Sequence, residues 1–139
     1  MSEGNVELVR RAYQGGDFLA HATPERWDRA FNEYLDEEIE VRLPPYPEGE
    51  PVFRGREGVE QYIGTLREVW SEYRFEPERF LDAGERVVVF ARIVGKGRAS
   101  GAPFELEIAQ VWTIHAGRAT SLLAYRDRSQ ALEAAGLGD

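Results

Sequence analysis

Residues 86–126, RVVVFARIVGKGRASGAPFELEIAQVWTIHAGRATSLLAYR, decide the fold of this chain. Apolar residues here do not recur at helical spacing, and short turns such as Ala116-Gly117 separate the apolar stretches. Short turns join antiparallel neighbours, so this half of the chain is predicted to form an antiparallel sheet. Its four predicted strands are residues 74–82, 86–97, 103–115 and 118–126.

The first half of the chain has a helical pattern instead. Apolar side chains recur three and four residues apart in three segments, which predicts amphipathic helices over residues 5–14, 23–35 and 59–73. Ile39–Leu43 alternates with period two and predicts a strand, after Asp36-Glu37-Glu38 end the second helix.

A proline-rich loop is predicted over residues 44–51, and a short last helix near the end of the chain. Asp127 can cap that helix, which is predicted to run through Ala135 and to stop at Gly136. Helices come first and strands later, so we expect one α+β domain over residues 1–139.

Composition excludes several classes of function. The chain has 139 residues, no Cys and a net charge of −8, which argues against nucleic-acid and membrane partners. The charge is uneven, with −10 over residues 1–85 and +2 over residues 86–139. With only His21 and His115, no histidine-rich metal site is expected, and no cofactor is predicted. We see no secretory signal and no membrane-spanning run, and expect a cytoplasmic protein.

Five segments together resemble a known family. They are Val6–Tyr13 with Gly16-Asp17, Tyr34–Val41, Phe53–Val59, Ala109–Ile114 and Tyr125–Asp127. In this order they resemble the NTF2-like superfamily, and most closely its SnoaL-like branch, which is related to ketosteroid isomerases. The resemblance covers nearly the whole chain. It implies an α+β cone in which a curved, mostly antiparallel sheet and three N-terminal helices enclose a pocket, and a homodimer packed through the sheets.

The faces of two strands suggest what such a pocket would contain. On strand 103–115, Gln110 is the one polar residue on a face that is otherwise apolar, which marks this as the concave face. By alignment from Gly84, Arg92 is predicted to share that face with Phe90, and a buried guanidinium needs a partner. Either residue could instead have a structural role, in a hydrogen bond within the core or in a salt bridge.

The hypothesis is a pocket with Gln110 and Arg92 at its floor and an apolar, largely aromatic wall. It suits a mostly apolar small molecule, similar to a polyketide or a steroid, with one carbonyl or carboxylate. The predicted ligand-binding residues are Trp27, Phe31, Tyr62, Trp70, Phe90, Arg92, Gln110, Trp112, Leu122 and Arg126.

The catalytic residues of the related enzymes are poorly matched. Resemblance to steroid isomerases implies a tyrosine, a carboxylate base and a protonated aspartate. The tyrosine position aligns near Val9, the base near Leu43 and the protonated aspartate with Gln110. Shifting the alignment of the first helix by one turn would put Tyr13 at the tyrosine position. These mismatches argue against steroid isomerase chemistry.

Asp127 is the nearest acid/base candidate for a cyclase, but a helix cap explains it better. Resemblance to epoxide hydrolases would make Arg92 the centre of an aspartate network. Glu107 could join that network only if the two faces of its strand were exchanged, which would place Gln110 and Trp112 on the outer face.

We therefore expect a SnoaL-like small-molecule-binding domain. The alternative is an isomerase, cyclase or hydrolase that uses the same pocket, with catalytic candidates Arg92, Gln110 and Asp127. A third possibility is a cone filled by side chains that acts only through its dimer surface.

Overall fold

The computed structural model describes residues 2–12, 25, 29, 33–42 and 52–137. Among them are three helices: α1 (Ser2–Ala12), α3 (Gly55–Val69) and α4 (Arg128–Ala134). The strands are β1 (Leu35–Arg42), β2 (Val52–Arg54), β3 (Trp70–Ala83), β4 (Arg86–Gly97), β5 (Pro103–His115) and β6 (Arg118–Tyr125).

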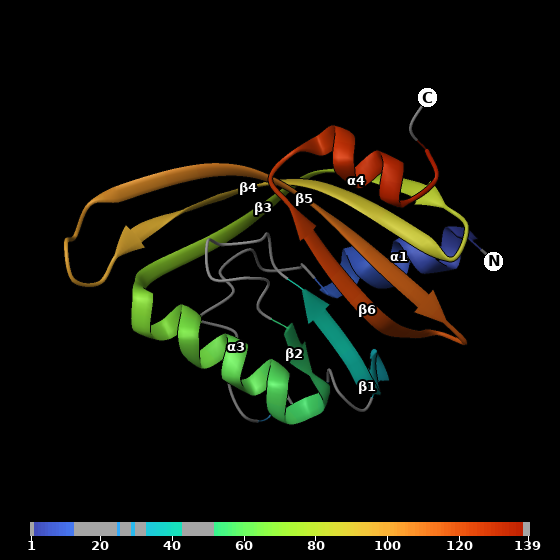
Figure 1. Ribbon diagram of the computed structural model, residues 1–139, viewed down its shortest axis with the longest axis horizontal. Helices are drawn as coiled ribbons and strands as arrows, with labels where there is room; N and C mark the ends of the chain where they lie inside the picture. Colours follow the sequence, from blue (N-terminus) through green and yellow to red (C-terminus); the bar gives the residue numbers. More distant parts are fainter. Residues whose placement is uncertain (1, 13–24, 26–28, 30–32, 43–51, 138–139) are drawn as a thin grey trace.

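The strands form one six-stranded sheet in the order β2-β1-β6-β5-β4-β3. The predicted antiparallel run is confirmed, since β3 to β6 pair in sequence order. β1 joins this run in parallel beside β6, and β2 pairs antiparallel with β1 at the edge. The fold is therefore the predicted α+β class, and Figure 1 shows the sheet curving around α1 and α3.

Two predicted helix ends are wrong. Asp36-Glu37-Glu38 do not close a helix but lie in β1, which already starts at Leu35. Leu35 pairs with Ala119 of β6, so sheet pairing overrides the local helical spacing. Trp70, predicted on the stripe of the third helix, instead begins β3 and pairs with Gly97.

The turns and the last helix follow the sequence closely. The β5–β6 turn has positive φ angles at Ala116 (51°) and Gly117 (78°), as a two-residue hairpin requires. Asp127 caps α4 by accepting a hydrogen bond from the Ser129 amide at 2.8 Å, which confirms the predicted cap. Gly136, with φ of 80°, follows the end of α4 as predicted.

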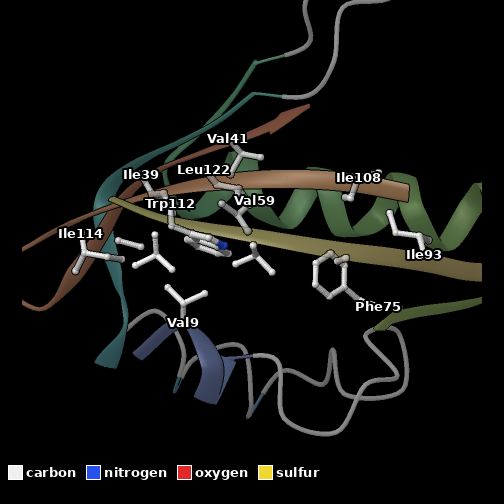
Figure 2. Close-up of a cluster of buried hydrophobic side chains, with 14 of the residues drawn as sticks. Val9, Ile39, Val41, Val59, Phe75, Ile93, Ile108, Trp112, Ile114 and Leu122 are labelled. Carbon is white, nitrogen blue, oxygen red and sulfur yellow. The ribbon is translucent and has the colours of Figure 1, made fainter. Parts of the chain in front are cut away.

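The sheet has two covered faces. We call concave the face that packs against α1 and α3, and convex the face that α4 covers (Figure 1). The larger core cluster lies on the concave face, where Val9 of α1 and Val59 of α3 meet the sheet. Figure 2 shows Trp112 within this cluster, with Ile93, Ile108 and Phe75 toward one end. A smaller cluster lies under α4, around Val88, Phe90, Val111 and Ala131.

Candidate functional site

Gln110 lies on the concave face of β5, in the middle of apolar neighbours. Ile108 and Trp112, two residues away on either side, both belong to the concave core cluster. Across the ladder, Gln110 pairs with Val89 of β4 and Ala124 of β6. Among the described residues, Gln110 is the only polar or charged residue classed as buried. The prediction that Gln110 lies on the concave face of β5 is therefore confirmed.

The side chains around the amide are almost fully buried. Trp112 is 9% exposed, Leu122 is 8% exposed and Gln110 is 7% exposed. Leu122 pairs directly with Trp112, so the three side chains are neighbours on one patch. Val89, beside them on β4, is 0% exposed. All four side chains are buried, and Val89 is the most completely covered of them.

The predicted placement of Arg92 is wrong. Arg92 pairs with Glu107, and Val89 pairs with Gln110, so Arg92 and Gln110 point to opposite faces of the sheet. On the convex face, Arg92 forms ion pairs with Glu78 at 3.6 Å and with Glu105 at 3.1 Å. Its side chain is 40% exposed. Arg92 belongs to a surface charge network and does not lie beside the amide.

The predicted placement of Phe90 on the concave face is wrong as well, because Phe90, like Arg92, lies on the convex face. It packs in the cluster under α4, and the Arg128 guanidinium lies over its ring at 4.7 Å. The same guanidinium reaches Glu78 at 2.6 Å. Glu78 of β3 thereby pairs with both Arg128 of α4 and Arg92 of β4, and its pair with Arg128 joins α4 to the sheet.

The physical reason for both errors lies in the composition of β4. Residues 87–91 of this strand are all buried, because the two core clusters cover both faces. A strand buried on both sides shows no alternation of apolar and polar residues. Its face can be assigned only from its register with β5.

The other predicted residues are spread around the cone. Tyr62 of α3 and Trp70 of β3 are half-buried and pack against the concave cluster. Arg126 and Asp127 lie past the end of β6 and are exposed. Trp27 and Phe31 lie outside the described residues, as do Leu43 and the proline-rich loop.

One feature of the concave face was not predicted. Trp70 and Phe104 stack with their ring centroids 4.1 Å apart and their planes 22° apart. Gly95 and Gly97 of β4 pair with Phe104 and Trp70, respectively. Two glycines in a long strand indicate a close approach, which was the available signal.

The described residues hold no group of three His, Asp or Glu side chains that could bind a metal ion. None of the described helices combines the length and apolar character needed to cross a bilayer.

The fold and its apolar concave face define an NTF2-like cone. The chain belongs to the SnoaL-like domain family, whose model matches residues 9–122. Among proteins with curated descriptions, no sequence matches the chain.

Solved structures agree with this assignment. A candidate SnoaL-like polyketide cyclase from Jannaschia sp. CCS1 is 18% identical, with a TM-score of 0.74 over 99% of this chain and 94% of that one. An NTF2-like protein of unknown function from Burkholderia pseudomallei is 22% identical, with a TM-score of 0.71 over 94% and 95%. A protein from Catenulispora acidiphila with a ketosteroid isomerase-like fold, in complex with trimethylamine, is 18% identical, with a TM-score of 0.62 over 86% and 93%. At these identities the likeness shows the fold alone.

Proposed function

We propose that this chain binds a small, mostly apolar molecule on its concave face, with the Gln110 amide bonded to one carbonyl or carboxylate of the ligand. The observation that carries the proposal is the position of Gln110, a buried amide between Ile108 and Trp112 on an apolar face. An amide in such surroundings fixes the orientation of a bound molecule, while the apolar side chains supply most of the contact. Polyketide-like and steroid-like compounds have this composition.

The side chains around the amide support this class of ligand. Trp112 and Leu122 provide apolar surface next to Gln110 and retain slight solvent access. Tyr62 and Trp70 provide aromatic surface from other elements on the same side of the sheet. The likeness to a candidate SnoaL-like polyketide cyclase is consistent with a polyketide-like ligand. Arg92 has no part in this proposal, because it lies on the other face.

The experiment pairs one substitution with two probes. Naphthoquinone and naphthalene share a ring outline, and only the first has carbonyl groups. We expect wild-type protein to bind naphthoquinone more tightly, as measured by isothermal titration calorimetry. In Gln110→Leu that preference should fall about fivefold, because a net hydrogen bond contributes about 1 kcal/mol. Affinity for naphthalene should stay the same.

Arg92→Leu is the matched control, because it replaces a polar side chain on the convex side of the neighbouring strand. It should leave both affinities unchanged. Equal affinity of Gln110→Leu and wild type for naphthoquinone, with both proteins folded, would contradict the role of the amide.

A second candidate function is catalysis on the same face. The likeness to a candidate polyketide cyclase favours it, since Gln110 could polarise a substrate carbonyl for an isomerase, cyclase or hydrolase. Mass spectrometry of a bound probe after long incubation distinguishes the two. An unchanged probe supports binding alone, and a rearranged or hydrated probe supports the enzyme.

We also propose a homodimer that packs through the sheet, as the resemblance implied. The part of the convex face around the Arg92–Glu105 ion pair is exposed to solvent, with side-chain exposures of 40% and 60%, so a second copy has access to the sheet there. Sedimentation analysis should give twice the 15.8 kDa chain mass. A single species at the chain mass would contradict the proposal.

A further inference from the structure

The cluster under α4 is a continuous apolar patch on the convex face, and it spans four strands. Its sheet residues form two rows across the strands: Leu81, Val88, Val111 and Leu123 in one, and Phe90, Ala109 and Tyr125 in the other. Val88 is 0% exposed and Val111 is 1% exposed, because α4 lies over the sheet here (Figure 1). An apolar patch of this extent, if uncovered, marks a contact between proteins. The helix that covers the patch therefore controls whether such a contact can form.

α4 covers this patch mainly with small side chains. Ala131, 0% exposed, and Ala135, 7% exposed, are the side chains that it buries most deeply. Each buries a single methyl group, so they contribute little to the energy that holds the helix on the sheet. The helix has seven residues, whereas an isolated helix needs roughly 12–15 residues to be even marginally stable in water. α4 is therefore helical only while it is docked, and its release costs less than unfolding of the sheet.

Polar contacts hold α4 at its two ends. At its start, Arg128 pairs with Glu78 at 2.6 Å and lies over the Phe90 ring. At its end, the Nη1 of Arg86 donates to the Ala134 carbonyl oxygen at 3.0 Å. The first contact is incomplete, because within the described part of the chain the buried Nε of Arg128 has no hydrogen-bond partner. A buried donor without an acceptor is unfavourable, so this contact favours docking less than its short distance suggests.

The two sheet residues in these contacts have opposite charges and lie at opposite ends of the patch. Arg86 pairs with Thr113, one row beyond Val88. Glu78 lies at the other end, where it also pairs with Arg92. When two copies stack their convex faces about a two-fold axis that runs across the strands, each end of one patch meets the opposite end of the other. Arg86 of one copy then lies near Glu78 of the second copy, and two such pairs replace the contacts to α4.

We propose that α4 is a removable cover over the surface through which two copies of this chain associate, so that the dimer is weak while α4 is docked and tightens when α4 is displaced. The inference rests on the proposed homodimer, because it concerns the same face of the sheet. Two sheets in direct contact lie about 10 Å apart, and a docked helix about 10 Å in diameter keeps them from this distance. Once α4 has left, the two apolar rows of each copy bury one another.

The test displaces α4 in the full-length chain. Ala131→Glu puts a charge at a position that is 0% exposed, so the helix leaves the patch. Sedimentation equilibrium over a range of protein concentrations should give a dimer dissociation constant at least about tenfold below that of wild type. Gln130→Glu adds the same charge at an exposed position of the same helix and is the matched control, expected to leave the constant unchanged. Circular dichroism verifies that the sheet of each variant is folded.

A charge exchange tests the two-fold arrangement. In the Ala131→Glu background, Arg86→Glu should weaken the dimer about tenfold, because like charges then meet at Glu78 of the second copy. Adding Glu78→Arg should restore the affinity. No effect of Arg86→Glu overturns this arrangement and the inference with it. If Ala131→Glu does not fold, Arg128→Ala removes both contacts at the start of α4 and should tighten the dimer in the same direction, by less.

The outcomes separate the cover from the homodimer. Folded dimers of wild type and Ala131→Glu with equal dissociation constants overturn the inference and leave the homodimer standing. Equal tightening by Gln130→Glu also overturns it, and so do open-ended aggregates of Ala131→Glu, because a two-fold pair closes at two copies. A monomeric wild type with a dimeric Ala131→Glu supports the cover and contradicts the wild-type dimer. If both proteins are monomers, both proposals fail together.

Discussion

The concave and convex faces of the sheet are made by alternate residues of the same strands, yet they are built differently. The concave face packs its core cluster against α1 and α3 and places one buried amide, Gln110, among apolar side chains. The convex face packs a smaller cluster under the seven-residue helix α4. Beyond α4 it carries half-exposed charges such as Arg92 and Glu78. A buried amide among apolar side chains suits a mostly apolar ligand with one polar group, and a network of exposed charges suits a surface.

Neighbouring valines in β4 test this comparison most strongly. Val88 and Val89 are both 0% exposed, but Val88 faces α4 and Val89 faces the concave cluster. Val89→Ala should cost about 2–3 kcal/mol, from two lost methyl groups and the cavity that they leave. Val88→Ala should cost less, because a short helix can shift to close the gap.

Urea unfolding of the two variants measures both losses of unfolding free energy. An unchanged slope of the unfolding free energy against urea concentration would show that the denatured state is not affected. Equal costs would mean that α4 is packed as rigidly as the concave core, and that the two faces do not differ in this respect.

The cap of α4 tests how firmly the convex face is covered. Asp127→Ala should cost about 1 kcal/mol, because the Ser129 amide loses its acceptor. Asp127→Asn keeps a side-chain oxygen and should cost much less. Thermal unfolding followed by circular dichroism measures both variants. A stable Asp127→Ala protein with impaired turnover of a substrate would instead assign Asp127 to the reaction.

Arg92 should give the smallest effect. Its pairs with Glu78 and Glu105 are solvent-exposed, so Arg92→Ala should cost between 0 and about 1 kcal/mol. The cost should shrink further in 1 M salt, where exposed charges are screened. Urea unfolding at low and high salt measures this. A loss of several kcal/mol, or loss of naphthoquinone binding, would place Arg92 in a buried role that its register with β5 contradicts.

The candidate site was predictable only in part. Gln110 and Trp112 could be placed on one face because β5 alternates clearly outside its buried middle. Leu122 lies on β6, and its pairing with Trp112 puts it on the same face. Trp70 was placed on a helix, because its spacing continues the stripe of α3. Its ring contact with Phe104 depends on a strand pairing that helical periodicity does not indicate.

The sequence by itself determined the strand order of the second half, the β5–β6 turn, the cap at Asp127 and the apolar face of β5. Each depends on contacts between residues close in the chain or on a clear period of two. Only the tertiary structure decided the face of β4, the parallel pairing of β1 with β6 and the Trp70–Phe104 stack. A one-residue change in register moves every side chain of a strand to the other face. In β4, apolar on both faces, register alone separates Arg92 from Gln110.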